Sequence, residues 1–200
     1  QAQQPDLRKM ILAPFNMLNA FLSMIEKTAN AARAGNHAKI RFKMNSLTDP
    51  ILAKSLIDAA SSGVCVDLCV RGACVLPSAA PVARHSGYIR VRSIVGRFLE
   101  HTRVYSFCNN GKDEFYAASA DWMERNLLNR VETCFPIEGN KLRNRMKEEF
   151  ECYLADNSQA WDLDSDGYYI QAQPQKDEET GETTVIRAQQ ILLEQLSAAN

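Results

Sequence analysis

The stretch YIRVRSIVGRFLEHTRVYSFCNNG, residues 88–111, decides how this chain is expected to fold. A strand is predicted at residues 89–94, where arginines alternate with apolar side chains, and a second alternating strand at residues 104–107. The tetrapeptide Glu-His-Thr-Arg at 100–103 stands between them. The Asn-Asn-Gly turn that ends the stretch predicts a return into a short strand at residues 115–118. We therefore expect a histidine and an arginine at the boundary between two strands of one sheet.

A strand–helix–strand unit precedes this stretch. Residues 39–44 alternate basic and apolar side chains, which predicts a strand with one basic face. Asp49 followed by Pro50 predicts the start of a helix that runs to Ser62. The strongly apolar residues 64–70 predict a strand buried in a sheet, and two strands joined by a helix favour a parallel pair. The sequence thus predicts an α/β fold with a mixed, largely parallel sheet flanked by helices.

The remaining elements surround this unit. Apolar residues that recur every three or four positions predict further helices, and short alternating runs predict further strands. These helices cover residues 7–34, with Pro14 as a first turn or a break, 140–154 and 185–197, and the strands cover 130–136, 161–163 and 168–170. We expect a flexible end at residues 1–10, then a single catalytic domain at 11–200 with an acidic, mobile loop at about 173–183.

Composition indicates a soluble globular protein. The 200 residues are 46% hydrophobic and carry a net charge of −1. The lack of a positive excess argues against nucleic acid as a partner. No apolar run approaches the roughly 18 residues of a membrane helix. No signal peptide opens the chain, which points to the cytoplasm, although Gln-Ala-Gln-Gln at residues 1–4 reads as an internal cut that removed the true start.

Cysteines and most histidines are assigned no chemistry. The chain has six cysteines and three histidines, with no Cys-x-x-Cys pair and no histidine at ligand spacing from a cysteine. Buried free thiols in a reducing compartment are expected, and no metal site. His37 and His85 lie in polar, loop-like surroundings and are assigned no role.

Arginines are concentrated between residues 71 and 103, where six stand against a single acidic residue. A guanidinium matches phosphate oxygens and stays charged at every relevant pH. Arg84, Arg90 and Arg92 are interpreted as solvated charges at strand edges. Arg71 and Arg103 lie at strand boundaries, where open α/β sheets place their ligands, and these two are expected to bind an anion.

His101 is the candidate for chemistry. It could act as a nucleophile, as a general acid to a leaving phosphate, or as a hydrogen-bond donor to a transferring one. Arg103, on an alternating strand, is expected to project to the same side, whereas Glu100 points away and is structural. A Ser-x-Asp turn at Ser119 and Asp121 strengthens the prediction. Together these residues outline a phosphoryl-transfer half-site.

Several longer motifs occur in a fixed order. They are Ile-Leu-Ala-Pro-Phe-Asn at 11–16, Lys-Met-Asn-Ser-Leu-Thr-Asp at 43–49, Val-Arg-Gly-Ala-Cys at 70–74, Ser-Ile-Val-Gly-Arg-Phe-Leu-Glu-His at 93–101, Ser-Ala-Asp-Trp-Met-x-Arg-Asn-Leu at 119–127 and Arg-Val-Glu at 130–132. Over about residues 11–170 the chain resembles bacterial polyphosphate kinases, in the last of the family's four domains. The resemblance implies a phospholipase D-like fold, in which two similar halves each contribute a histidine to one active site.

The resemblance also implies a transferase that moves the terminal phosphate of ATP reversibly to inorganic polyphosphate, through a phosphohistidine and with magnesium (Mg2+). The phosphorylated histidine and the magnesium-associated arginines belong to a preceding domain, so the chain should supply a half-site and be inactive alone. His101 matches the second active-site histidine, and Arg71 matches an arginine that contacts nucleotide phosphates. Arg103 is expected to bind phosphate too. Supporting residues are expected at Lys43, Asn45, Ser119, Asp121 and Asn126.

The implied partners are ATP or ADP, inorganic polyphosphate, the upstream domains and further copies in a homo-oligomer. The implied location is the cytoplasm, with peripheral attachment at the inner membrane as an option.

Two departures and two alternatives accompany the resemblance. Pro-Ser-Ala-Ala-Pro at 77–81 replaces the family's Pro-Gly turn, and Arg103 replaces the lysine of the phospholipase His-x-Lys motif, which keeps the charge and changes the geometry. One alternative is a phosphodiesterase or phosphatidyl transferase of the phospholipase D type. The other is a non-catalytic module that binds polyphosphate or nucleotide.

Overall fold

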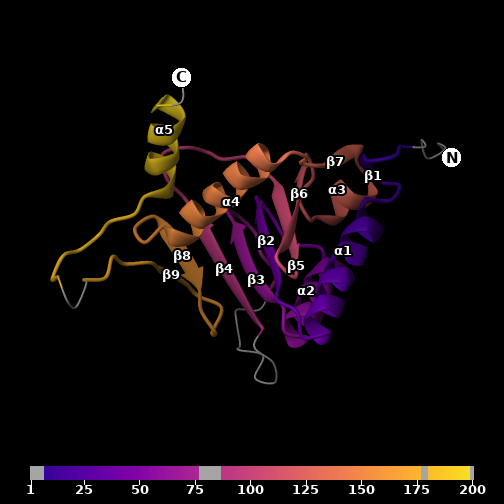
Figure 1. Ribbon diagram of the computed structural model, residues 1–200, viewed down its shortest axis with the longest axis horizontal. Helices are drawn as coiled ribbons and strands as arrows, with labels where there is room; N and C mark the ends of the chain where they lie inside the picture. Colours follow the sequence, from indigo (N-terminus) through magenta and orange to yellow (C-terminus); the bar gives the residue numbers. More distant parts are fainter. Residues whose placement is uncertain (1–6, 77–86, 177–179, 199–200) are drawn as a thin grey trace.

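The computed structural model describes residues 7–76, 87–176 and 180–198. In that part of the chain one nine-stranded sheet has the order β1-β7-β6-β5-β2-β3-β4-β8-β9, with helices against both faces (Figure 1). The strands are β1 (Ile11–Ala13), β2 (Ala38–Met44), β3 (Cys65–Val70), β4 (Tyr88–Ile94), β5 (Val104–Asn109), β6 (Lys112–Ala118), β7 (Glu132–Pro136), β8 (Ala160–Leu163) and β9 (Tyr169–Gln171). The helices are α1 (Met17–Arg33), α2 (Pro50–Ser61), α3 (Glu124–Leu128), α4 (Asn140–Ala155) and α5 (Ala188–Ala198).

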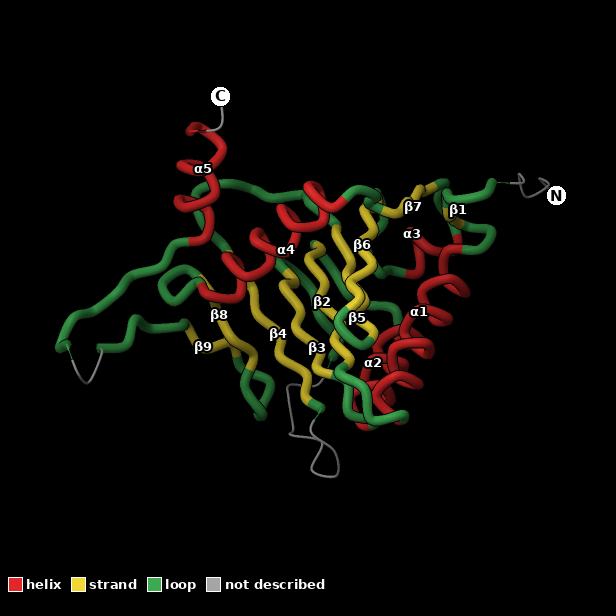
Figure 2. The backbone as a smooth tube through the Cα atoms, in the orientation of Figure 1, coloured by secondary structure: helices red, strands yellow, loops and turns green. Residues whose placement is uncertain are grey.

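The α/β class and the mixed sheet are confirmed, but the expectation of a largely parallel sheet is wrong. Among the described strands only β2 with β3 and β3 with β4 pair in parallel, and the other six pairings are antiparallel. The parallel pairs need a crossover, which α2 supplies between β2 and β3. Short turns join β5 to β6 and β8 to β9 (Figure 2), and turns of that length can only reverse the chain. Asn110 and Gly111, with φ of 52° and 77°, form the first of these turns.

The two faces of the sheet are covered by different helices. Helices α1 and α2 pack on one face, and α4 lies across the other, with α5 against it (Figure 1). Beneath α1 lies a cluster of buried rings from Phe21, Phe42, Tyr105, Phe107 and Trp122. The ring centroids of Phe42 and Trp122 are 4.5 Å apart in an edge-on arrangement, which adds to the stabilisation from burial.

The basic face of β2 is buried beneath α4. Arg41 forms an ion pair of 2.7 Å with Glu151, and Lys43 forms one of 2.6 Å with Glu100. The Lys43 ammonium also lies 4.5 Å from the centroid of the Tyr153 ring. Because buried charges need partners, this face is an internal charged layer between the sheet and α4.

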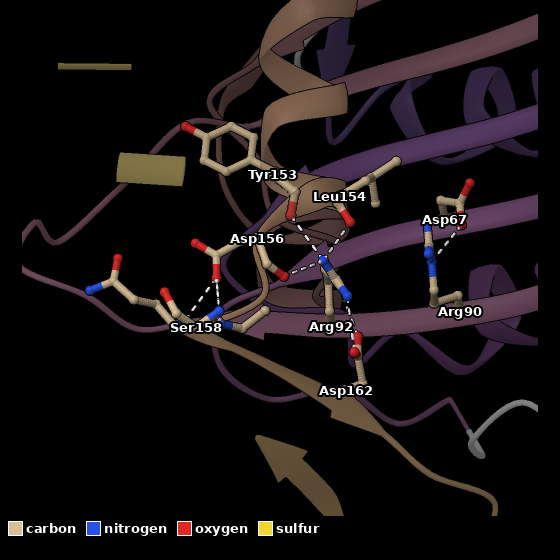
Figure 3. A network of polar contacts seen from close by, with 10 residues as sticks. Asp67, Arg90, Arg92, Tyr153, Leu154, Asp156, Ser158 and Asp162 are labelled. Atoms are coloured by element: carbon tan, nitrogen blue, oxygen red, sulfur yellow. Dashed lines mark hydrogen bonds and ion pairs between the residues drawn. The ribbon is translucent and has the colours of Figure 1, made fainter. Parts of the chain in front are cut away.

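Arg92 is also buried, so its interpretation as a solvated charge was wrong. Its Nη1 donates to the carbonyls of Tyr153, Leu154 and Asp156 at 3.2, 2.6 and 3.1 Å (Figure 3). Its Nε and Nη2 donate to the two carboxylate oxygens of Asp162 at 3.0 and 2.9 Å. The last carbonyls of a helix lack intrahelical partners, and Arg92 satisfies those of α4. No local pattern in the sequence shows that α4 ends beside β4.

The carboxylate of Asp156 completes this junction. It accepts hydrogen bonds from the three backbone N–H groups of residues 158–160 (Figure 3) and, at 2.8 Å, from the N–H of Ala188 at the start of α5. We call this set the Arg92–Asp156 junction, and it joins β4, α4, β8 and α5. By contrast, Arg90 is partly exposed, as expected, and donates to Asp67 at 2.9 Å.

The first predicted helix begins later than expected. Ile11–Ala13 forms β1, paired antiparallel with β7, and α1 starts only at Met17. The side chain of Asn16 accepts a hydrogen bond of 2.8 Å from the N–H of Leu12, which closes the turn around Pro14. Pairing at the sheet edge satisfies backbone groups that a helix would otherwise have satisfied.

The other predicted elements are confirmed within the described residues. Asp49 caps α2, since its side chain accepts a hydrogen bond of 2.8 Å from Leu52 N–H, and the β8–β9 hairpin turns near Gly167. Residues 1–6, Arg84, His85, the loop at 77–81 and residues 177–179 of the acidic segment lie outside the described part. Within the described ranges, no helix combines the length and the hydrophobicity needed to cross a membrane.

Candidate functional site

Four strands bring the candidate residues to one edge of the sheet, by which we mean the side where β2, β3, β4 and β6 end. Met44, the last residue of β2, pairs with Val70, the last residue of β3. Val104, the first residue of β5, lies between Lys43 and Ala117, near the ends of β2 and β6. We call the four segments that leave this edge the site loops: residues 45–49, 71–76, 95–103 and 119–123.

Asp121 ties three of the site loops together. Its buried carboxylate accepts hydrogen bonds from the backbone N–H groups of Asn45 and Ser46 at 2.7 and 3.2 Å. Its other oxygen accepts from Arg103 Nη2 at 3.0 Å and from Asn45 Nδ2 at 3.5 Å. The aspartate of the predicted Ser-x-Asp turn therefore shapes the site, because its acceptors already bind groups of the chain.

Ser119 and Asn126 are directed elsewhere, to Glu132. The Ser119 hydroxyl donates to one oxygen of the Glu132 carboxylate, and Asn126 Nδ2 donates to the other at 2.6 Å. The hydroxyl also accepts from Thr133 N–H at 3.1 Å, which fastens the 119–123 loop to β7. Glu132 was part of a predicted motif but was not among the predicted site residues. Its role depends on contacts between β7 and the residues around the 119–123 loop, which only the fold creates.

His101 and Arg103 do not alternate along one strand, because β5 begins only at Val104. They are joined differently: Arg103 Nη1 donates to the carbonyl oxygen of His101 at 2.9 Å. The other end of the same guanidinium is held by Asp121. The imidazole of His101 is left exposed, and no hydrogen bond joins it to the residues described.

Arg71 is held by its backbone and free at its side chain. Its N–H donates to Met44 O at 3.2 Å, and its carbonyl accepts from the Ser93 hydroxyl at 2.9 Å. Its Nε is buried and has no hydrogen-bond partner within the described part of the chain. The next residue is tightly packed, because a Cβ at Gly72 would lie 3.0 Å from Asn45 O. A buried donor without a partner marks a place where a ligand can bind.

Glu100 is structural, as expected, and it anchors the loop that carries His101. Its carboxylate pairs with Lys43 at 2.6 Å and accepts from Tyr153 at 2.7 Å and from Gln189 Nε2 at 2.8 Å. Burial raises the pKa of Glu100, but Lys43 and the hydrogen bonds outweigh burial, and the pKa lies below its ordinary value. Lys43 therefore neutralises Glu100 and is not free for a ligand.

Gln189 was missed by the sequence reading. From α5 its amide accepts from Phe98 N–H at 2.9 Å and donates to Phe98 O at 2.9 Å, in addition to Glu100. It follows the loop by about ninety positions, and a lone glutamine on a helix carries no signal of such a contact.

Arg71, His101 and Arg103 lie at the same edge of the sheet. They differ in how many of their side-chain groups are free to bind a ligand. Arg103 and Asp121 are occupied in shaping the loops, and in the described residues no hydrogen bond joins the Arg71 guanidinium to the His101 imidazole. An exposed imidazole can donate or accept a proton, and a free guanidinium can bind an anion. The edge can thus bind a phosphate and exchange a proton with it.

Comparisons with known proteins agree with the motifs. The family model described as polyphosphate kinase C-terminal domain 2 matches residues 10–183. The polyphosphate kinase of Pseudomonas aeruginosa is 48% identical over 192 residues, which cover 96% of this chain and 27% of that protein. The polyphosphate kinase of Thermosynechococcus vestitus is 44% identical over 191 residues, 95% of this chain and 26% of that protein. The chain spans about a quarter of the length of these relatives.

Solved structures confirm the expected fold. Polyphosphate kinase from Porphyromonas gingivalis superposes with a TM-score of 0.88 at 33% identity, over 98% of this chain and 29% of that one. Nuc from Salmonella typhimurium, a phospholipase D family member, superposes with a TM-score of 0.57 at 19% identity, over 78% of this chain and 97% of that one, and shares the fold. By sequence and by structure, the chain belongs to the polyphosphate kinase C-terminal domain family.

Proposed function

We propose that residues 11–200 act as one domain that supplies half of the active centre of a polyphosphate kinase. The whole enzyme would transfer the terminal phosphate of ATP reversibly to inorganic polyphosphate. One observation carries the assignment of residues: exposed His101 and the unpartnered guanidinium of Arg71 lie at the same sheet edge. Phosphoryl transfer depends on positioning and on neutralising charge, and these two groups are suited to both.

The proposed reaction has two transfers. First, the bond between the terminal phosphorus of ATP and its bridging oxygen breaks as a bond forms to a histidine nitrogen in a preceding domain, and ADP leaves. Second, the phosphoryl group moves from that nitrogen to the terminal oxygen of polyphosphate. His101 donates a hydrogen bond or a proton to a phosphate oxygen, and Arg71 neutralises charge on the transferring group. Arg103 and Asp121 act as positioning residues, because they hold the backbone beside His101.

Magnesium, which the resemblance implies, is proposed to be held by ligands outside this chain. Among the described residues no three His, Cys, Asp or Glu side chains form a group that could hold a metal ion. The roles given to His101 and Arg71 do not depend on it. The proposal further includes ATP and polyphosphate as substrates, the upstream domains as partners, a homo-oligomeric assembly and a cytoplasmic location, all of which follow from the resemblance.

The test uses the whole enzyme that contains this chain. His101→Ala should lower polyphosphate synthesis from ATP by about 100-fold or more, as expected for the loss of a proton-transferring group. His37→Ala is the matched control, because His37 is exposed and precedes β2, at the opposite end of that strand from the site loops. The isolated 200-residue chain should show no synthesis. Activity of His101→Ala within twofold of the unchanged enzyme would contradict the role of His101, and synthesis by the isolated chain would contradict the half-site.

The fold shared with a phospholipase D family member keeps diester cleavage as a second candidate. It predicts release of p-nitrophenol from bis-p-nitrophenyl phosphate by the whole enzyme, with loss of that activity in His101→Ala. We expect no release, because Arg103 is held between Asp121 and the His101 carbonyl and cannot bind a diester bidentately without breaking those contacts. The non-catalytic alternative predicts unchanged polyphosphate binding in both Arg71→Ala and His101→Ala.

A further inference from the structure

A cavity of about 440 Å³ lies next to the site loops and has no role in the proposed transfer. Its walls come from the loop after β4, from the start of β8 and its neighbour β9, and from the first turn of α5. These elements are remote in sequence but lie together on one side of the molecule (Figure 1). The Arg92–Asp156 junction, which includes Ser158 (Figure 3), holds three of them in place. Ser158 also lines the cavity. The volume falls in the range of small-molecule sites.

The cavity is positively charged. Arg97 and Arg187 line it, and its lining includes no Asp or Glu. Both arginines are exposed, and neither forms an ion pair among the residues described. Arg92, in the strand that leads to this loop, is instead neutralised by Asp162. Two guanidinium groups without carboxylate partners at one cavity favour an anionic ligand, and phosphate oxygens match the geometry of a guanidinium.

Aromatic rings and amides line the same cavity. Trp161 is 39% exposed and Phe98 is 43% exposed, whereas the chain's other tryptophan, Trp122, is fully buried. The Phe98 ring lies 5.5 Å from the Arg97 guanidinium carbon, so a ring and a cation are adjacent at the wall. Gln159 adds an amide that can both donate and accept. An exposed indole beside arginines and amides is suited to a planar base that carries phosphate, since bases stack on such rings.

We propose that this cavity binds a nucleoside phosphate, with the base against Trp161 and the phosphates between Arg97 and Arg187. The site is separate from Arg71, which does not line it. It is nevertheless connected to the site loops, because Gln189 forms part of its wall and its amide holds Phe98 and Glu100. A nucleotide bound here would contact the loop that carries His101. The inference does not rest on the proposed function, because binding requires no transfer.

Equilibrium dialysis of the whole enzyme with ADP tests the inference. The unchanged enzyme should bind ADP in two classes of site. The double variant Arg97→Gln/Arg187→Gln should lose one class and keep the class that Arg71→Ala weakens. Trp161→Leu should weaken ADP binding at the class that the double variant loses by about fivefold or more, since base–ring stacking contributes roughly 1–3 kcal/mol. Arg8→Gln is the matched control, because Arg8 is exposed and lies at the far N-terminal end.

Inorganic tripolyphosphate separates the base from the phosphates. It should compete with ADP at the class that Arg71→Ala weakens, and should bind at least about fivefold more weakly than ADP at the cavity. Two results would overturn the inference: unchanged ADP classes in the double variant, or equal affinity of the cavity for tripolyphosphate and ADP. Because the double variant spares Arg71, finding only the class of site that Arg71→Ala weakens would leave the proposed function standing and remove only this inference. Thermal melting checks that the variants stay folded.

Discussion

Arg92 and Arg71 lie close together at the ends of adjacent parallel strands, and their guanidinium groups are used in opposite ways. Arg92, in β4, donates five hydrogen bonds to the end of α4 and to Asp162. Arg71, directly after β3, has a buried Nε with no acceptor in the described residues. The Ser93 hydroxyl, one residue beyond Arg92, donates to the Arg71 carbonyl. Two neighbouring arginines thus differ in whether the chain itself supplies hydrogen-bond partners for the guanidinium group.

The difference separates a structural arginine from one available to a ligand. A buried polar group is normally satisfied, so full satisfaction indicates a role in the fold, whereas a group without a partner at the site loops is available to a ligand. Arg103 lies between these extremes, because its two terminal nitrogens are bonded within the chain while its Nε is not. The same reasoning distinguishes Glu100 and Asp121, which are satisfied, from the exposed imidazole of His101.

The largest effect on stability is expected at Arg92. Arg92→Ala would leave the last carbonyls of α4 without donors and Asp162 without its cation. We expect the free energy of unfolding to fall by about 3 kcal/mol, at the lower end for a broken buried ion pair because Asp162 is partly exposed. Urea denaturation of the 200-residue chain measures it, with Arg8→Ala as a control that should change little. A loss below about 1 kcal/mol would show that the junction is not the main support of α4.

Arg71 should show the opposite pattern. Arg71→Ala removes a group with no acceptor in the described residues, so the free energy of unfolding should change by less than about 0.5 kcal/mol. In the whole enzyme kcat/KM should fall about 100-fold, as for the loss of a donor aimed at developing charge. Arg71→Lys should recover part of this, because the charge stays and the fork is lost. If Arg71→Ala destabilised the fold as much as Arg92→Ala, the comparison would fail.

Gln189 tests whether α5 positions the loop of His101. Gln189→Ala would remove the side-chain partner of the Phe98 N–H and carbonyl and one of the three partners of Glu100, and should lower the free energy of unfolding by about 1–2 kcal/mol. In the whole enzyme kcat should fall several-fold with little change in KM, because the loop loses order while Arg71 is untouched. Gln190→Ala is the matched control, since the neighbouring glutamine is exposed and bonds only Glu194 within α5. Equal effects of both substitutions on kcat would argue against positioning.

The smallest effect is a pH dependence from Glu100. Its pKa in the folded chain lies below the ordinary value of 4.5, so its contribution to stability is present above pH 4.5 and is lost as the pH falls through the lowered pKa. Urea denaturation between about pH 5 and pH 3 should therefore show a steeper loss of stability for the unchanged chain than for Glu100→Gln. Identical slopes would mean that Lys43 does not stabilise the charged form.

Local patterns were sufficient for much of the fold. Asp49 and Pro50 predicted the start of α2, and the Asn-Gly turn predicted the β5–β6 hairpin, because caps and turns depend on a few consecutive residues. The delayed start of α1 was not predictable in this way. Residues 11–13 fall within a longer pattern of apolar residues at helical spacing. Only pairing with β7, more than a hundred residues away, makes them a strand.

For the candidate site, the placement of the residues was predictable and the hydrogen-bonding states of their side chains were not. The motifs identified Arg71, His101, Arg103 and Asp121, and the strand boundaries placed them at one edge of the sheet. Whether a side chain is free or occupied depends on what packs against it. Asp121 meets two backbone N–H groups, and Glu100 meets α4 and α5, through contacts that no spacing encodes.

The amino-acid sequence by itself determined the family, the α/β class and the identity of the histidine and arginines at the sheet edge, because each follows from short motifs and local periodicity. Only the tertiary structure decided that Arg92 is bound while Arg71 is available, that Gln189 reaches the His101 loop, and that a charged cavity lies beside β8. Hydrogen-bond partners and cavities arise where distant segments meet, and that meeting is a property of the packed chain.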